Sequence, residues 1–527
     1  KMYARCGMLE KAQSVHEELH VRDIVSWSAL ITGYTHLGKV HEALNTLEQM
    51  QSEGLSPNAF TLASVLKACG SMRGLCKGKE IHEVIMTMGL LEKDIVLGTA
   101  LVDMYAKCGL LTKAHDVLEE LPIRNVISWT ALISGYCEHK QAHQALNCFY
   151  QMQNEGLPPN ATTFVSILQA CGTVGIVNEG THIHEEIVSS GLLEKHIMIV
   201  VRGFLEKDVV LGNALVDMYA KFGMLAKSLE VLKSLLVRNV ISWNALIAGY
   251  SQQGRCDEAK NCFQQMQSEG ISPDAATYTC MLKVSGSAGD IVQGNQIHDE
   301  IVGRGLLAKD IVLGNALVDM YSKCGMLPNA RKALENLHIR NVVSWNALIG
   351  GYAQHGYGEE ALDCFELMKN RCRIIPDACT FICVLKACGT IGASTKGRDV
   401  FTEIARNELQ KKDIMVATAL IDMYAKLGAL EKARAVCDHL EDRDVVSWTI
   451  LIDGYVQNGL ANEALECFRK MEDEGVPPSE VSYICILKAC STLGSLEIGQ
   501  DIDAQIRKLG LFQKDPGLAN TLLHMYA

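Results

Sequence analysis

The stretch VSWSALITGY, residues 25–34, decides the fold, because four near-copies of it follow along the chain. The copies are ISWTALISGY at 127–136, ISWNALIAGY at 241–250, VSWNALIGGY at 343–352 and VSWTILIDGY at 446–455. The tryptophans of the five stretches, Trp27, Trp129, Trp243, Trp345 and Trp448, are 102, 114, 102 and 103 residues apart. A period that continues through the whole chain indicates an array of repeats rather than one globular core.

Three related repeats fill each period and account for nearly the whole chain. The repeat with the tryptophan is 35 residues long and lies at 24–58, 126–160, 240–274, 342–377 (one residue longer) and 445–479. The second is 36 residues long, carries LKACG or a variant, and lies at 59–94, 161–208, 275–310, 378–413 and 480–515. The third is 31 residues long, carries ALVDMYAKCG or a variant, and lies at 95–125, 209–239, 311–341 and 414–444. Residues 1–23 and 516–527 match parts of a third-type repeat, so we expect the chain to be a fragment.

Blocks of three repeats give the predicted domain organisation. They cover 24–125, 126–239, 240–341 and 342–444, and two complete repeats with a partial one follow at 445–527. The repeat at 161–208 is twelve residues longer than its counterparts, and IMIVVRGFLEKD at 197–208 echoes IVSSGLLEKH at 187–196. We interpret this insertion as a small tandem duplication that lengthens the second helix of that repeat or its exit turn.

Each repeat is predicted to form two antiparallel helices. In the first repeat, Trp27, Leu30, Ile31 and Tyr34 make an apolar stripe with helical spacing. Gly38 interrupts the pattern, as glycine does just past a helix end. A second stripe is formed by Ala43, Leu44, Leu47 and Met50, and the turn sequence SEGLSPN at 52–58 ends it. One helix pair cannot bury both stripes, so we expect an all-α solenoid in which each pair packs on its neighbours.

Twenty cysteines raise the question of a metal or disulfide site, and their positions within the repeats argue against one. One position holds Cys69, Cys171, Cys388 and Cys490, with Ser285 in the remaining copy; a second holds Cys148, Cys262, Cys364 and Cys467, with Thr46; a third holds Cys6, Cys108 and Cys324, with Phe222 and Leu427. Positions that also accept Ser, Thr, Phe or Leu are packing positions, where a free cysteine acts as a small hydrophobe. No C-x-x-C pair occurs, so we expect no metal site and reduced, structural cysteines.

Two tripeptides, His16-Glu17-Glu18 and His184-Glu185-Glu186, match the H-x-E half of a zinc deaminase signature. The C-x-x-C half is missing, and His184 shares one repeated position with His82 and His298, which favours a helix surface over catalysis. The chain also contains no phosphate-binding glycine loop, dinucleotide-binding turn or nucleophile elbow. We therefore expect no active site, no cofactor and no small-molecule substrate.

Net charge and the distribution of apolar residues also bear on the class of protein. A formal net charge of −12 argues against a protein that coats phosphates indiscriminately. No run of about 18 apolar residues occurs, so we expect no membrane-spanning helix.

The rotation of 35, 36 and 31 residues, together with these motifs, resembles the pentatricopeptide repeat family, specifically its plant-type arrays of alternating P, L and S motifs. The tryptophan repeats correspond to P motifs, the LKACG repeats to L motifs and the ALVDMYAKCG repeats to S motifs. The resemblance covers essentially all 527 residues, in 14 complete motifs and two partial ones. It implies a right-handed superhelical α-solenoid. A tetratricopeptide array would instead repeat at about 34 residues with a different signature.

The resemblance also implies that the fifth and last residues of a motif together read one base of single-stranded RNA, and we call these two residues a reading pair. In the P motifs the reading pairs are Ser28/Asn58, Thr130/Asn160, Asn244/Asp274, Asn346/Asp377 and Thr449/Ser479. In the S motifs they are Thr99/Asn125, Asn213/Asn239, Asn315/Asn341 and Thr418/Asp444. An Asp carboxylate only accepts hydrogen bonds and suits uracil or guanine, whereas an Asn amide also donates and suits adenine or cytosine. A short Thr or Ser as the fifth residue leaves room for a purine, while Asn fits a pyrimidine. Helix caps and turns prefer the same four residue types and are the alternative interpretation.

Other positions follow from the resemblance less directly. The second residue of each P and S motif is apolar and would wedge between bases, although a core role is equally open: Val25, Val96, Ile127, Val210, Ile241, Val312, Val343, Met415 and Val446. The thirteenth residue of each S motif is a lysine that would face the RNA backbone or only solvent: Lys107, Lys221, Lys323 and Lys426. The L motifs depart from the pattern with the apolar fifth residues Ala63, Val165, Ile382 and Ile484, and only Thr279/Asp310 matches a reading pair. We expect L motifs to act as spacers.

Taken as implied by the resemblance, the function is that of a sequence-specific single-stranded RNA-binding adaptor in a plant mitochondrion or chloroplast, which recognises sites of C-to-U RNA editing. A deaminase-like domain beyond Ala527, or other editing factors in trans, would supply the chemistry, so the chain itself is expected not to be an enzyme. The alternatives are an organelle RNA splicing or stability factor and a protein–protein scaffold. A scaffold would not need reading pairs that vary among Ser, Thr, Asn and Asp.

Overall fold

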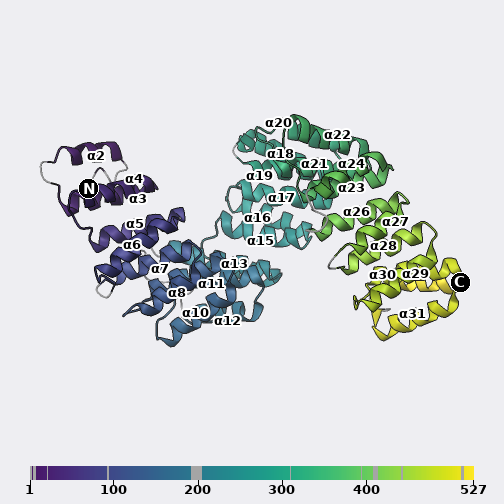
Figure 1. The fold of residues 1–527 in the computed structure, drawn as a ribbon, viewed down its shortest axis with the longest axis horizontal. Helices are drawn as coiled ribbons and strands as arrows, with labels where there is room; N and C mark the ends of the chain where they lie inside the picture. Colours follow the sequence, from purple (N-terminus) through teal and green to yellow (C-terminus); the bar gives the residue numbers. More distant parts are fainter. Residues whose placement is uncertain are drawn as a thin grey trace. The chain divides into compact units, whose positions relative to one another are not determined.

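The computed structural model describes residues 3, 8–19, 22–91, 94–190, 205–308, 310–392, 394–406, 413–440, 443–511 and 516–527. Within these ranges the regular structure is entirely helical, which confirms the predicted all-α class. Contacts divide the chain into unit 1, Lys1–Ser272, and unit 2, Pro273–Ala527, and each is treated by itself (Figure 1). None of the helices in the described ranges is long and apolar enough to cross a membrane.

Unit 1 follows the predicted rotation of helix pairs. Its helices are α2 (Leu9–Glu17), α3 (Ile24–His36), α4 (Val40–Ser52), α5 (Ala59–Met72), α6 (Leu75–Thr87), α7 (Ile95–Lys107), α8 (Leu111–Glu120), α9 (Val126–Glu138), α10 (Ala142–Asn154), α11 (Ala161–Val174), α12 (Val177–Ser189), α13 (Leu205–Lys221), α14 (Leu225–Ser234), α15 (Val240–Gln252) and α16 (Cys256–Ser268).

Unit 2 continues the same order. It contains α17 (Ala275–Ala288), α18 (Ile291–Gly303), the short turn η1 (Leu306–Ala308), α19 (Ile311–Lys323), α20 (Leu327–Asn336), α21 (Val342–Gln354), α22 (Gly358–Glu366), the π-turn η2 (Leu367–Arg371), α23 (Ala378–Ile391), α24 (Ser394–Arg406), α26 (Ile414–Lys426), α27 (Leu430–Asp438), α28 (Val445–Gln457), α29 (Ala461–Asp473), α30 (Glu480–Leu493), α31 (Leu496–Lys508) and α32 (Pro516–Tyr526).

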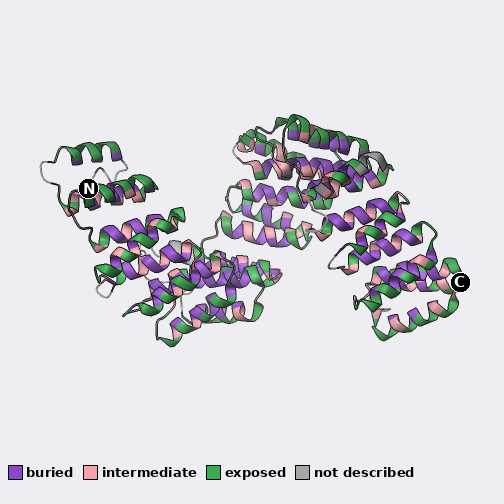
Figure 2. Ribbon diagram, viewed as in Figure 1, coloured by how far each residue is buried: buried purple, intermediate pink, exposed green. Residues whose placement is uncertain are grey.

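Within each unit, the first helices of successive motifs pack on one another and form a continuous layer. The layer is α3, α5, α7, α9, α11, α13 and α15 in unit 1, and α17, α19, α21, α23, α26, α28, α30 and α32 in unit 2. The second helices make a second layer; α10, for example, packs on α9 of its own motif and on α11 of the next. Figure 2 shows buried and exposed residues alternating along the helices, as expected where one side of a helix is covered.

The predicted apolar stripe forms the core of each motif. Trp27 is 3% exposed and Ile31 is fully buried, and Trp243 and Trp448 are each 1% exposed. Gly38 has a φ of 70°, in the left-handed region, which ends the first helix as predicted. Packing against neighbouring motifs therefore buries the apolar stripes that a single helix pair would leave exposed.

The cysteines behave as packing residues. The two most frequent cysteine positions are buried, and Cys69, Cys171, Cys388 and Cys490 are at most 1% exposed. Burial raises the pKa of the Cys69 thiol to about 11 and that of the Cys148 thiol to about 12. Their thiols are therefore protonated and unreactive at neutral pH.

The insertion at 197–208 is only partly described, because residues 191–204 lie outside the described ranges. The predicted lengthening of the L-motif helix is wrong: α12 has 13 residues, like α6 and α18. Instead α13 has 17 residues where α7, α19 and α26 have 13, because residues 205–208 add a turn at its start. Leu, Glu and Lys favour helix, and no Gly or Pro separates them from the following helix. The alternative of a longer exit turn falls on residues outside the described ranges.

The extra residue of the P motif at 342–377 changes the backbone hydrogen bonds at the end of its second helix. In the other four P motifs the carbonyl of a fully buried methionine accepts from the N–H five residues later, as in Leu55 to Met50 at 3.2 Å. Here Ile374 donates to the Met368 carbonyl from six residues later at 3.1 Å. The additional residue is accommodated by η2, in which Cys372 donates to the Leu367 carbonyl.

Candidate nucleic-acid interface

The last residues of the P and S motifs are all N-caps of the first helix that follows. Each side-chain oxygen accepts from the backbone N–H three residues later, at 2.8–3.2 Å, in Asn58, Asn125, Asn160, Asn239, Asp274, Asn341, Asp377, Asp444 and Ser479. These bonds satisfy N–H groups that have no partner within the helix. The capping interpretation of these residues is therefore confirmed.

Capping uses only part of the hydrogen-bonding capacity of these side chains. An Asn that accepts through Oδ1 at a cap must direct its Nδ2 group elsewhere, where it remains a donor. An Asp that accepts through Oδ1 retains Oδ2, which can accept from another partner. Capping thus fixes the side chain and determines whether a donor or an acceptor is presented next to the helix start.

Within unit 2, a direct hydrogen bond joins the two residues of a reading pair in two motifs. Asn346 Nδ2 donates to Asp377 Oδ1 at 2.9 Å, and Asn315 Nδ2 donates to Asn341 Oδ1 at 3.3 Å. The fifth residue of one motif and its last residue thus meet at the start of the next motif. Burial opposes ionisation of Asp377, but bonds from the Thr380 N–H, from Asn346 and from the Thr380 hydroxyl together lower the pKa of its carboxyl group. Asp377 is therefore an ionised acceptor at neutral pH.

A hydroxyl that the sequence reasoning missed joins three further pairs. Ser28, Thr130 and Thr449 contact Thr61, Thr163 and Ser482 at 2.5, 2.7 and 2.6 Å, respectively. Each of these hydroxyls also bonds to the capping side chain, as Thr61 does to Asn58 Oδ1 at 2.8 Å. The bridging residue is the third residue of the following L motif. A hydroxyl at this position in every L motif, through Thr277 and Thr380 as well, is the signal in the sequence that identifies it.

The other reading pairs show different contacts. Thr99 and Thr418 donate back to carbonyls of their own helices, those of Ile95 and Ile414. Asn213 is 8% exposed, and its Oδ1 has no hydrogen-bond partner among the described residues. Asn244 lies in unit 1 and Asp274 in unit 2, so each residue is described within its own unit and no geometry is given for the pair.

The second residues of the P and S motifs form an apolar row on the surface, so the core interpretation is wrong for them. Their exposed fractions range from 49% for Val446 to 66% for Val25. The row consists of Val25, Val96, Ile127, Val210, Ile241, Val312, Val343, Met415 and Val446. Each lies in the first turn of a first helix, three residues before the fifth residue of its motif. Apolar side chains in this position are available to contact the faces of bases.

The lysines of the S motifs are less free than their sequence positions suggest. Each forms an ion pair with the aspartate four residues earlier: Lys107–Asp103 at 2.8 Å, Lys221–Asp217 at 2.6 Å, Lys323–Asp319 at 2.8 Å and Lys426–Asp422 at 2.7 Å. Their stems also pack over a glycine of the preceding L motif; a Cβ on Gly70, for example, would lie 3.4 Å from Lys107 Cδ. A phosphate would have to compete with the aspartate, and backbone contact by these lysines stays a prediction.

The L motifs differ from P and S motifs in how their last residue caps the next helix. Asp94 accepts from both Val96 and Leu97 N–H groups, and Asp310 accepts from both Val312 and Leu313. The ψ angle at these residues is 105°, whereas the caps that end P and S motifs have ψ near 170–180°. The different backbone directs the carboxylate more fully onto the helix start. The spacer role of the L motifs stays a prediction that this geometry favours.

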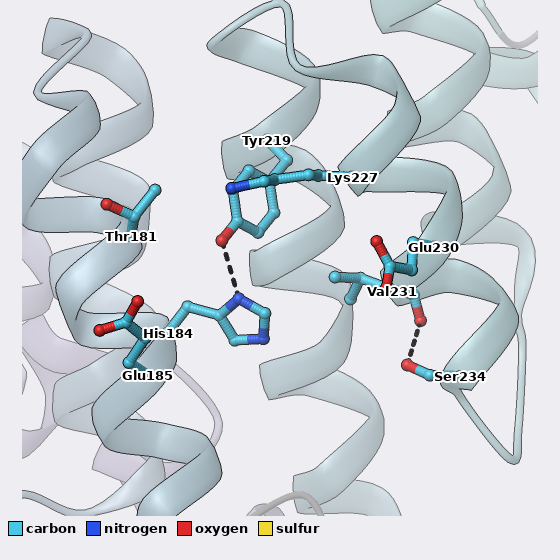
Figure 3. A pocket seen from close by; sticks show the side chains of 8 residues that line it. All are labelled: Thr181, His184, Glu185, Tyr219, Lys227, Glu230, Val231 and Ser234. Atoms are coloured by element: carbon cyan, nitrogen blue, oxygen red, sulfur yellow. Dashed lines mark hydrogen bonds between the residues drawn. The ribbon is translucent and has the colours of Figure 1, made fainter.

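The side chains of the histidine-containing motif at 184–186 bond to residues of two different motifs. His184 Nδ1 lies 2.7 Å from the Tyr219 hydroxyl in a cavity of about 330 Å³, which Lys227 and Glu230 also line (Figure 3). Glu186 instead accepts from Gln153 of the preceding motif, so the two side chains of the H-x-E motif bond to opposite neighbours. Equivalent bonds join His82 to Tyr105 and His298 to Tyr321, both at 2.8 Å. In the part of the chain that the structure describes, no three His, Cys, Asp or Glu residues gather as a metal site would require.

Comparison with known proteins identifies the repeats. The model described as PPR repeat family matches residues 22–71, 124–173, 238–285, 340–390 and 443–492, and the model described as PPR repeat matches 1–24, 99–126, 213–240 and 416–445. The fold is similar to that of the maize pentatricopeptide repeat protein PPR10, with a TM-score of 0.50 and 19% identity over 98% of this chain and 83% of that one.

Curated relatives from Arabidopsis thaliana match over most of the chain. The pentatricopeptide repeat-containing protein At4g33990 is 31% identical over 99% of this chain and 60% of its own length. The chloroplastic protein At1g11290 is 34% identical over 82% of this chain and 51% of its own length, and the mitochondrial protein At3g09040 is 32% identical over 100% and 49%. The chain thus spans about half to three fifths of the length of these relatives. From the matched repeats and the identity of its relatives, the chain belongs to the pentatricopeptide repeat family.

Proposed function

We propose that this chain is a sequence-specific single-stranded RNA-binding adaptor of a plant organelle. The observation that carries the proposal is the surface formed by the reading pairs and the apolar row. Each capping Asn or Asp is oriented by the helix that it caps, and capping occupies only one of its polar side-chain atoms. An exposed apolar side chain lies three residues before the fifth residue of the same motif. A base needs both: an edge partner that discriminates and a face partner that stacks.

Variation among the reading pairs supports reading rather than capping alone. Capping is served about equally well by Asn, Asp and Ser, so it does not require a particular one at each motif. Base reading requires a particular residue at each motif, because Asp presents an acceptor to the base whereas Asn presents a donor. The pairs change between copies, while neighbouring residues such as the tryptophan and the following Ala-Leu-Ile are nearly constant.

The test of RNA binding is a comparison of the same RNA in two forms. Single-stranded RNA should bind, and the same RNA annealed to its complement should bind much more weakly, because pairing hides the base edges that the reading pairs contact. Equal binding of the two forms would mean that the chain recognises only the charged backbone.

For the biological role we propose recognition of C-to-U editing sites in organelle transcripts, with a deaminase supplied in cis or in trans. The names of relatives place them in chloroplasts and in mitochondria, which supports an organelle without choosing one. A plant lacking the protein should retain unconverted cytidines at a small number of sites in organelle RNA. Normal editing together with unspliced or shortened transcripts would favour a splicing or stability factor instead.

A further inference from the structure

An ion pair recurs where an S motif meets the following P motif. Arg22–Glu53, Arg124–Glu155, Arg238–Glu269 and Arg443–Glu474 are 2.7, 2.8, 2.7 and 3.1 Å apart. The arginine is always the residue before the last residue of the S motif, and the glutamate is the thirtieth residue of the P motif. In four of the five copies, a carboxylate thus neutralises an arginine beside the surface of the reading pairs.

The fifth copy, in unit 2, replaces the carboxylate with a second cation. Arg340 occupies the arginine position and Arg371 occupies the glutamate position. Arg340 donates to the carbonyls of Leu334 and Glu335, at 3.0 and 2.6 Å. Among the described residues no carboxylate lies within ion-pair distance of Arg340, Arg371 or Arg373, and all three are exposed. Because the equivalent positions are in contact in the other four copies, the repeat places three guanidinium groups near one motif junction, where no described carboxylate pairs with them.

The turn that carries two of these arginines is kept in an unfavourable conformation. Arg373 has a φ of 52°, whereas the equivalent residues of the other P motifs are Gly54, Gly156, Gly270 and Gly475, with φ of 74–78°. A side chain in this region is disfavoured, and such residues concentrate at functional sites. The extra residue of η2 moves this position one residue further along the chain and exposes Arg371, Cys372 and Arg373 together.

The three arginines flank two reading pairs. Arg340 directly precedes Asn341, which accepts from Asn315, and Arg373 lies four residues before Asp377, which accepts from Asn346. A single strand that offers consecutive bases to nearby pairs would carry its phosphates past this junction. An arginine fork binds phosphate through two parallel N–H bonds and remains charged at any physiological pH.

We propose that Arg340, Arg371 and Arg373 form a phosphate clamp for the RNA backbone at this motif junction. The clamp rests on the proposed RNA binding and adds to it a place where affinity is concentrated. At the other four S–P junctions the equivalent arginine is held in an ion pair with its glutamate. Because phosphates are common to all sequences, the clamp strengthens binding and leaves the base preferences to the reading pairs.

The test measures the salt dependence of single-stranded RNA binding. Arg371→Gln with Arg373→Gln should make the slope of log K against log salt less steep by roughly 0.7 per lost contact, up to about 1.4 in total. The matched control removes two exposed cations from second helices of the same unit, by Arg469→Gln with Lys508→Gln, and should leave the slope unchanged. The ratio of affinities for matched and scrambled RNA should stay the same in both variants.

A further variant separates the clamp from folding. Arg373→Gly restores the residue of the other P motifs and relieves the left-handed backbone, so the protein should melt no earlier than wild type while the slope becomes less steep by roughly 0.7. A slope in the clamp variants equal to that of the control pair overturns the clamp and leaves RNA binding standing. A wild-type chain that binds no RNA overturns both proposals.

Discussion

Asp377→Asn separates base reading from helix capping at one motif. Asp377 Oδ1 accepts from the Thr380 N–H at 2.8 Å, from the Thr380 hydroxyl at 2.9 Å and from Asn346 Nδ2 at 2.9 Å. All three donors are neutral, and the Asn oxygen can accept from each of them. Asn and Asp cap helices about equally well, so the loss should be limited to the interaction of the charge with the helix, about 0.3–1 kcal/mol. Thermal stability should therefore change little.

The base preference should change much more. The second carboxylate oxygen can accept from the ring N–H of uracil, and an Asn amide in its place donates to the ring nitrogen of cytosine. Discrimination by a well-formed base contact is about 1–3 kcal/mol, or roughly 5–150-fold in affinity. The assay is binding, at one fixed salt concentration, of two RNAs that differ only by uracil or cytosine opposite the Asn346/Asp377 pair. The variant should prefer cytosine.

Asp377→Ala provides the comparison. It removes the cap, at a cost of about 0.5–2 kcal/mol, and leaves no group to read the base. It should melt earlier than Asp377→Asn and bind the two RNAs equally. If Asp377→Asn melts as early as Asp377→Ala and still prefers uracil, Asp377 is only a cap and the reasoning is refuted.

Three further predictions concern the rest of the surface and the core. Replacing Lys107, Lys221, Lys323 and Lys426 with Gln should make the salt slope less steep by roughly 0.7 for each lysine that contacts phosphate, and an unchanged slope would leave them as partners of their aspartates only. Val343→Ala and Val446→Ala should change the free energy of unfolding by less than about 0.5 kcal/mol, because the side chains are 53% and 49% exposed, yet weaken RNA binding; unchanged RNA affinity would count against base stacking. Burial lowers the pKa of His82, His184 and His298, so the neutral form is favoured in the folded state and their contribution to stability, full above a pH of about 6.5, is lost as the pH falls below it. The fourth L motif has Phe401 at this position. Replacing all three histidines with Phe should reduce the pH dependence of the free energy of unfolding between pH 7 and about pH 5. A pH dependence that is unchanged in this variant must arise from other groups.

The periodicity of apolar residues was enough to predict the helix pairs and their stacking. The spacing of Trp27, Leu30, Ile31 and Tyr34 places these residues on one helix face, and burial of that face follows from stacking. The insertion at 197–208 interrupts the periodicity, and its structure was harder to predict. The duplicated residues 205–208 extend α13, because local helix preference rather than repeat register decides how an insertion is accommodated.

At the candidate site, local chemistry was predictable and contacts between motifs were not. The capping role of Asn58 follows from its residue type and position, whereas its link to Ser28 through Thr61 depends on how two first helices pack. The sequence does not decide whether the apolar row lies in the core or on the surface, because it does not show which side of a helix the neighbouring helices cover. The Asp103–Lys107 ion pair, by contrast, is predictable from the sequence, because the two residues have the i, i+4 spacing at which side chains meet on a helix.

The central claim is that the reading pairs select a base sequence, and one binding experiment tests it most directly. With one base for each of the 14 complete motifs, L motifs left unspecified, and the N- to C-terminal direction aligned with 5′ to 3′, the reading pairs specify A-N-A-A-N-Y-U-N-Y-U-N-G-A-N. Binding of this RNA is measured against a scrambled RNA of the same composition at a fixed salt concentration. The account predicts clearly tighter binding of the specified sequence. Equal affinities for the two RNAs would contradict it.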